Sequence, residues 1–206
     1  MQAATELLID DLQEMADSWK EGGTAQQALA AKGTDGGLAT ILTGMGSLAY
    51  GELAGERIKL GLMLHDPEEE HDCFSDNTHW SHFYDAKGIK NAYLGQYTRV
   101  DGSDVKGQSL SDLVKVADAD LDAEMKDKLN ATEKAMQAMV DEAEKGRTFD
   151  VLIGANEAAG NQIIQNVVDA LVAQTKTTEK IIVTLALNNI ELEGSDSLDN
   201  PASIAQ

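Results

Sequence analysis

The spacing of apolar residues along the chain predicts helices almost throughout. Residues 4–20 form an amphipathic segment, and helical spacing recurs over residues 120–144 and 151–187. Only two prolines occur in 206 residues, and alternating runs of the β type are scarce. These patterns predict an all-α protein. The apolar face of the first segment is formed by Leu7, Leu8, Leu12 and Met15.

The least polar run of the chain lies in its first third. Residues 37–50 carry no charge, and Glu52, Glu56 and Arg57 then follow within the same run. We expect one long helix here, from about residue 38 to 64. A helix that is apolar on all sides is usually buried, and a buried charge is costly unless it is paired. The three charged residues are therefore paired or functional, and we expect Glu52 and Glu56 to be largely buried.

Shorter helices follow the central run. Ser75, Asp76 and Asn77 are residue types that cap a helix start, so we expect a helix over residues 78–86 that ends at Lys87-Gly88. A further helical piece reaches about residue 97, and residues 100–109 read as a loop.

Long helices joined by short connections are typical of an up-and-down bundle. We therefore predict a single helical-bundle domain over residues 1–190, with four main helices, some of them broken. Residues 191–206 are rich in small and polar side chains and read as an irregular tail.

The charge of the chain limits its partners. The formal net charge is −20, from 36 acidic and 16 basic residues. This balance argues against nucleic acid, whose phosphates require Lys and Arg, and favours partners that carry positive charge. The single cysteine, Cys73, excludes an internal disulfide. We find no apolar segment of the ~20 residues that cross a membrane, and the acidic N-terminus is unlike a signal peptide.

One dense cluster of metal-ligand side chains follows the central run. Glu68-x-x-His71 and Asp76-x-x-His79 each place a carboxylate and an imidazole one helical turn apart. Helical bundles hold di-iron centres with pairs of this spacing, and the donor types suit iron, zinc or manganese. The alternative is a solvated acidic loop that holds a histidine by chance, and we expect Glu69 and Glu70 to be exposed in either case.

Glu52 and Glu56 lie one turn apart on the same helical face. Two carboxylates at this spacing repel each other, unless a cation or Arg57 lies between them. Two interpretations remain open for these residues: part of a metal site, or an ion pair that uses Arg57.

Several stretches together resemble one known family. GMGSLAYGELAGERI, EEEHDCFSDNTHW, DAKGIKNAYLGQYTRVDG and SLSDLV are similar to the C-terminal half of imelysin-like proteins, also called the iron-regulated protein A or insulin-cleaving metalloproteinase family. The resemblance implies an all-helical protein of the bacterial envelope, periplasmic or envelope-associated, linked to iron acquisition. It also implies a metallopeptidase-like site between two halves, with a G-x-H-x-x-E motif in the N-terminal half.

This chain lacks that motif. In His65-x-x-Glu68, Met63 stands where the motif has glycine, and Pro67 interrupts the turn. We therefore expect a protein that binds a metal ion, iron first, or a metal-bearing ligand. The alternatives are an imelysin-type metallopeptidase and a non-catalytic interaction module. We also expect a homodimer or association with a separately encoded N-terminal half.

The candidate residues are those that match the family stretches. The predicted metal ligands are Glu52, Glu56, His71, Asp76 and His79, and the predicted ligand-binding residues are Arg57 and Ser75.

Overall fold

The computed structural model describes residues 2–188 and 190–204. It divides the chain into two compact units, residues 1–41 and 42–206. The first unit holds α1 (Gln2–Ser18), α2 (Thr24–Ala30) and the beginning of α3 (Gly33–Ser47). No residue of α1 is buried, and its apolar face is exposed.

The predicted central helix is continuous from Gly33 to Leu64, but its backbone changes type twice. After α3 it becomes a π-helix, η1 (Leu48–Lys59), and then α4 (Leu60–Leu64). A π-helix is closed by hydrogen bonds between residues five apart and usually extends for only a single turn. Twelve residues of it are therefore unusual. The sequence did not predict this change of backbone.

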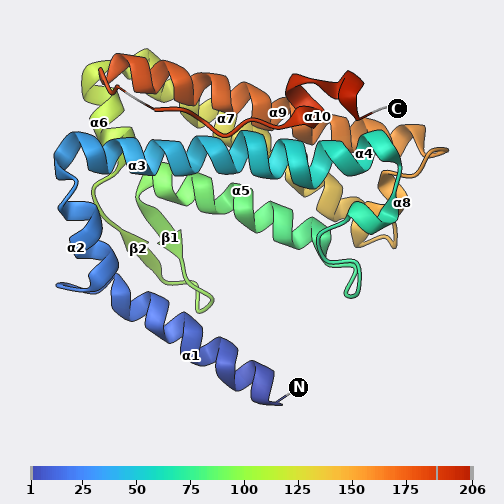
Figure 1. The fold of residues 1–206 in the computed structure, drawn as a ribbon, viewed down its shortest axis with the longest axis horizontal. Helices are drawn as coiled ribbons and strands as arrows, with labels where there is room; N and C mark the ends of the chain where they lie inside the picture. The colour runs from blue at the N-terminus through green and yellow to red at the C-terminus, as the bar shows by residue number, and fades with distance from the viewer. Residues whose placement is uncertain (1, 189, 205–206) are drawn as a thin grey trace. The chain divides into compact units, whose positions relative to one another are not determined.

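Four helical segments form the bundle of the second unit. They are η1, α5 (Thr78–Leu94), α7 (Ala119–Ala143) and α9 (Ala158–Thr184). The long helices α7 and α9 lie side by side, and η1 packs against α9 and α5 (Figure 1). Two short helices, α6 (Leu110–Ala117) and α8 (Phe149–Leu152), flank them. The prediction of an all-α bundle is confirmed.

The core follows from helical spacing. On α7 and α9 the buried positions recur every three or four residues, which places them on one face of each helix. The side chains in the centre are mostly Leu, Ile, Val and Met. Fully buried examples are Leu42, Leu53, Ile58, Met125, Met136, Met139, Phe149, Ile164 and Leu171.

The helix α5 corrects one predicted boundary. It continues through Lys87-Gly88 to Leu94, because Ile89 and Tyr93 extend the buried face of its first half. The helix ends at Gly95, which adopts the left-handed conformation with φ 59°. A small antiparallel hairpin follows, β1 (Gln96–Thr98) and β2 (Asp104–Lys106). The helix therefore stops before residue 97, where it was predicted to end, and only β2 lies in the predicted loop.

The last predicted helix is broken near its start. The short α8 ends at Leu152, and α9 begins only at Ala158. The Asn161 side chain donates to the backbone carbonyls of Leu152 and Gly154, at 2.8 and 3.0 Å, and so satisfies acceptors at the end of α8. Gly160 lies so close to the Leu152 backbone that α8 packs directly against α9.

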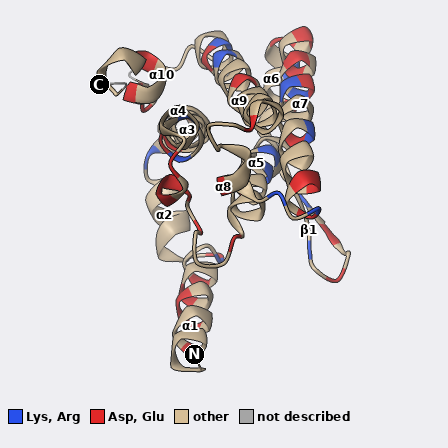
Figure 2. Ribbon diagram, turned by 90° about the vertical axis from the view of Figure 1, so that its right-hand side faces the viewer, with Lys and Arg blue, Asp and Glu red and all other residues tan. Residues whose placement is uncertain are grey.

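The C-terminal segment is more regular than predicted. It contains α10 (Asp196–Asp199) and a short 3₁₀ turn (Pro201–Ser203), and it runs beside the helix of residues 42–64 (Figure 1). Acidic and basic side chains interleave along α7 (Figure 2). Among the described residues, no helix has the length and apolar character needed to cross a membrane.

Candidate functional site

The π-helix aligns two residues that an α-helix would separate. In an α-helix, residues five apart point about 140° away from each other. In η1 the hydrogen bonds join residues five apart, so Glu52 and Arg57 lie on the same face. The Arg57 Nε and Nη2 atoms donate to Glu52 Oε1 at 2.9 and 2.7 Å. The change of backbone thus creates this ion pair.

Arg57 also reaches the loop that follows α4. Its Nη1 atom donates to His71 Nδ1 at 2.7 Å. Because a guanidinium has no acceptor, His71 Nδ1 must be the acceptor and the ring proton lies on Nε2. His71 is therefore a neutral imidazole in this arrangement. One cation, the Arg57 guanidinium, joins a carboxylate and an imidazole from two different segments.

The loop of residues 66–77 turns one carboxylate inward. Asp66 caps the short 3₁₀ helix η2 (Pro67–Glu69). Glu70 follows, is 8% exposed, and accepts a hydrogen bond from the Thr78 hydroxyl at 3.0 Å. Burial raises the pKa of the Glu70 carboxyl, and the bond from Thr78 partly opposes this.

These residues enclose a pocket of about 390 Å³ between η1 and the loop. Five carboxylates, one guanidinium and one imidazole line it, so negative charge predominates and a bound cation is favoured. We call it the acidic pocket. Its lining is Glu52, Glu56, Arg57, Leu60, Glu68, Glu69, Glu70 and His71.

Two of the four predicted glutamate exposures are wrong. Glu69 is exposed as expected, and Glu52 is half-buried, with 42% of its side chain exposed. Glu56 is exposed, because it lies on the outer side of η1, where Ser195 of the C-terminal segment donates to it at 2.6 Å. Glu70 is buried, because its carboxylate turns inward to the hydroxyl of Thr78.

The structure brings together only part of the predicted site. Glu52, Glu56, Arg57 and His71 line the acidic pocket, whereas Ser75, Asp76 and His79 do not. The described residues contain no group of three or more His, Cys, Asp or Glu side chains in an arrangement that could hold a metal ion.

The three outlying residues have structural surroundings of their own. The Ser75 hydroxyl donates to the Asp72 carbonyl at 3.2 Å, and Asp76 is exposed with a left-handed backbone at φ 50°. His79 is 8% exposed in the first turn of α5. Burial lowers the pKa of the His79 imidazole, while the charges of Glu144 and Asp76 oppose this.

Sequence reasoning missed one histidine, His82. Its ring is 1% exposed and lies 6.0 Å from the His71 ring, centroid to centroid. Across residues 2–188 and 190–204, neither ring nitrogen of His82 has a hydrogen-bond partner. Burial lowers the pKa of this imidazole to about 3, and the charge of the Arg57 guanidinium acts in the same direction. The spacing His79-x-x-His82, one helical turn, was the available signal.

Asp85 lies one turn beyond His82 and was also missed. Burial raises the pKa of its carboxyl, and the charge of Arg57 acts in the opposite direction. Asp85 is nevertheless an exposed residue, and it does not line the acidic pocket.

A comparison with known families gives one match. The model of the imelysin family, a family of peptidases, matches residues 1–178. The chain belongs to the imelysin family. No curated protein matches the sequence. The matched region includes every predicted site residue and ends within α9.

In this imelysin-family chain, His65-x-x-Glu68 does not form a helical pair. His65 ends α4 in the left-handed conformation, with φ 53°. Its Nδ1 atom lies 2.6 Å from the Ile153 carbonyl oxygen, so this nitrogen donates to the backbone. His65 joins α4 to the segment after α8, and Glu68 lines the acidic pocket separately.

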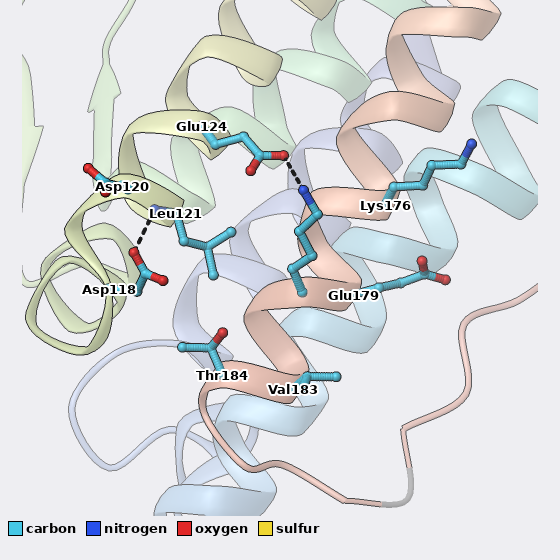
Figure 3. A pocket seen from close by; sticks show the side chains of 9 residues that line it. Asp118, Asp120, Leu121, Glu124, Lys176, Glu179, Val183 and Thr184 are labelled. Carbon is cyan, nitrogen blue, oxygen red and sulfur yellow. Dashed lines mark hydrogen bonds and ion pairs between the residues drawn. The ribbon is translucent and has the colours of Figure 1, made fainter.

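A larger pocket of about 760 Å³ lies between the start of α7 and the end of α9 (Figure 3). Two of its carboxylates already have partners. Asp118 accepts from the Leu121 backbone N–H at 2.9 Å and caps α7, and Glu124 pairs with Lys180 at 2.7 Å. The acidic pocket differs because it holds four of the seven predicted site residues, Glu52, Glu56, Arg57 and His71.

Proposed function

We propose that this imelysin-family chain binds a metal ion, or a ligand that carries one, in the acidic pocket. Glu52 and His71 are the first donors, and Glu56 is available at the rim. The observation that carries the proposal is the position of Arg57. Its guanidinium lies where a carboxylate oxygen and an imidazole nitrogen converge, each 2.7 Å away. A positive charge is held at that point.

The donors at this point suit a transition metal. A neutral imidazole nitrogen and a carboxylate oxygen are the pair that iron, zinc and manganese accept. His71 presents Nδ1 in its unprotonated form, which is the form that binds a metal. Further oxygen donors are present among the pocket glutamates. The donor types suit a metal, but no three of the described side chains are arranged to hold one, and Arg57 occupies the point where Glu52 and His71 converge.

Displacing the Arg57 guanidinium from Glu52 costs little free energy. Its side chain is 40% exposed and that of Glu52 is 42% exposed. An ion pair at such exposure contributes about 0.2–1 kcal/mol. A metal ion therefore competes with Arg57 for Glu52 and His71, and the guanidinium is then free to hold an anionic part of the ligand.

The test compares metal uptake of the wild type, Arg57→Met and His71→Ala with Fe²⁺, Zn²⁺ and Mn²⁺ by titration calorimetry. Arg57→Met removes the competing cation and is expected to bind about 2–5-fold more tightly, the equivalent of the ion pair. His71→Ala removes a donor and is expected to lose at least 10-fold in affinity.

Two matched controls separate the pocket from general effects of charge and histidine. Glu124→Gln removes an ion-paired carboxylate of comparable exposure, and His65→Ala removes an imidazole outside the pocket. Both are expected to bind as wild type does. If neither wild type nor Arg57→Met takes up any of the three metals at millimolar supply, the proposal fails.

A metallopeptidase is the second candidate, because the matched family is one of peptidases. Glu70 is buried in the same pocket and its carboxyl has a raised pKa, as a general base requires. Cleavage of unfolded casein with added zinc, abolished by a chelator and by Glu70→Gln, would support this candidate. Intact casein after prolonged incubation would exclude it for this chain.

A further inference from the structure

Residues 192–199, here called the strap, lie against the end of α3 and the π-helix η1 (Figure 1). Three glycines of the helix face the strap, and the contacts join Gly46 to Leu192, Gly51 to Glu193, and Gly55 to Ser195. An added Cβ atom would lie 2.6 Å from the partner at the first glycine, 2.7 Å at the second, and closer still at the third. Real Cβ atoms do not approach other atoms so closely, so the strap lies in a groove that only glycine allows.

Hydrogen bonds attach both ends of the strap to the helix. The Glu193 backbone N–H donates to the Ser47 hydroxyl at 2.9 Å. The Tyr50 hydroxyl donates to the Asp199 carboxylate at 2.6 Å. The strap is therefore held along its length, and each end bonds to a different turn of the helix.

Two buried serines attach the centre of the strap to the π-helix itself. The Ser195 hydroxyl donates to the Glu56 carboxylate at 2.6 Å. The Ser197 hydroxyl donates to the Gly55 carbonyl at 2.9 Å. The same carbonyl accepts the backbone N–H of Leu60, five residues further along, which is a hydrogen bond of the π type. A strap hydroxyl thus bonds directly to an acceptor of the π-helical backbone.

The contacts of the strap depend on π-helical spacing. Gly46 and Gly51 are five residues apart, and in an unbroken α-helix they would point about 140° away from each other. The strap could not then lie against both glycines. In the structure the backbone is π-helical from Leu48 onward, and both glycines face the strap. The same spacing places Arg57 beside Glu52.

The ion pair between Arg57 and Glu52 is too weak to account for this backbone by itself. Both side chains are half-exposed, and an ion pair at such exposure contributes little to stability. A π-helix usually extends for a single turn, whereas η1 has 12 residues. A further interaction must therefore hold η1 in this form, and the strap is the segment that bonds to it at several points.

We propose that the strap holds η1 in its π-helical form. When the strap leaves, η1 returns to α-helical spacing, and the Arg57 side chain turns away from Glu52 and no longer joins it to His71. The strap is thus a conformational device that sets the arrangement of the acidic pocket. The proposal concerns the backbone of η1 and does not depend on what the pocket binds.

The strap is suited to opening because it is lightly buried. Within residues 192–199, only Ser195 and Ser197 are buried. Segments with few buried contacts open locally at a lower free energy than the core of a fold. The strap can therefore leave the helix while the bundle of α5, α7 and α9 stays folded.

The test uses two variants that release the strap from opposite sides of the contact. Ser195→Ala combined with Ser197→Ala removes the central hydroxyls, and Gly51→Ala places a Cβ atom against the Glu193 carbonyl. Hydrogen exchange of residues 192–199, followed by mass spectrometry, reports release of the strap. A folding defect in one variant leaves the other to decide.

NMR spectroscopy of the same proteins reports the backbone of η1. Contacts between the α-proton of one residue and the amide proton of the fifth residue after it are diagnostic of a π-helix. Exchange of the Arg57 Nε proton with water reports its bond to Glu52. In both variants we expect faster exchange throughout the strap, loss of the five-residue contacts, and several-fold faster exchange of the Arg57 proton.

Three further variants serve as controls. Ser203→Ala removes a hydroxyl that donates only to the nearby Asn200 carbonyl, and Gly44→Ala adds a Cβ atom that meets no described atom within 4 Å. Both are expected to match wild type. Arg57→Met removes the ion pair, and we expect it to keep both the seated strap and the five-residue contacts.

Each other outcome overturns the proposal. If the strap is released and the five-residue contacts remain, η1 is π-helical without the strap. If Arg57→Met loses these contacts while its strap stays protected, the ion pair holds the π-helix. If the strap stays protected in both release variants, the contacts described above do not seat it. None of these measurements uses a metal, so the proposed function is tested separately.

Discussion

Replacing His82 by leucine tests the most unusual burial in the chain. The ring lies at 1% exposure, in edge-to-face contact with Phe149 at a centroid distance of 5.5 Å. In the described part of the chain, both of its nitrogens lack a hydrogen-bond partner. Replacing such a group by an apolar one of similar size is neutral or stabilising. At pH 7.5 we therefore expect His82→Leu to be at least as stable as wild type.

The effect of pH has a definite sign. In the unfolded chain the pKa of a histidine is about 6.5, and in the folded chain the pKa of His82 is about 3. Between these values only the unfolded state binds the proton, so the free energy of unfolding falls as pH falls. At pH 5, about 1.5 units below the unfolded pKa, the loss is about 2 kcal/mol, at 1.36 kcal/mol per unit.

Urea unfolding followed by tryptophan fluorescence measures this difference. Trp80 lies on the same helix as His82 and reports on the region. Both proteins are unfolded at pH 7.5 and pH 5.0 with a chelator present. Because the other titrating groups, including His79, are present in both proteins, their contributions cancel in the double difference. We expect wild type to lose about 2 kcal/mol more than His82→Leu. Equal losses in the two proteins would refute the reasoning.

Three further substitutions test the bundle itself. Gly88→Ala should raise the free energy of unfolding by up to about 1 kcal/mol, because Gly88 lies inside α5 and an added Cβ would meet none of the described atoms within 4 Å. Thermal unfolding measures the change, and a lower melting temperature would contradict the prediction. Asp122→Ala should lower the free energy of unfolding by about 3 kcal/mol, because the buried carboxylate accepts hydrogen bonds from Tyr93, Ser111 and Lys126. Tyr93→Phe removes only one of these hydrogen bonds and should lower the free energy of unfolding by about 1 kcal/mol. Equal losses in Asp122→Ala and Tyr93→Phe would refute this account of the hydrogen bonds to Asp122.

Helical spacing was sufficient to predict α7 closely. The expected range, 120–144, differs from the observed Ala119–Ala143 by one residue at each end. Its apolar positions recur at three or four residues, and Asp118 caps its start. By contrast, the expected end of α5 at Gly88 was wrong, because a glycine inside a helix is tolerated where the buried face continues beyond it.

The candidate site was only partly predictable. The sequence identified the residue types and the two segments that supply Glu52, Arg57 and His71. It could not show that Arg57 joins the other two, because α-helical geometry places Glu52 and Arg57 on different faces. It also missed His82, whose burial depends on packing against Phe149, 67 positions further along the chain.

The sequence by itself determined the helical class, the family and the acidic character of the chain, because these depend on local spacing, on matched stretches and on composition. The tertiary structure alone decided the π-helix, the inward turn of Glu70 and the packing of the C-terminal segment Leu192–Ser195 against Gly46, Gly51 and Gly55. Because a glycine has no side chain, its sequence position does not indicate what packs against it. Whether a glycine is a flexible position or the floor of a groove depends on which distant segment packs against it, and here that segment lies about 140 residues further along the chain.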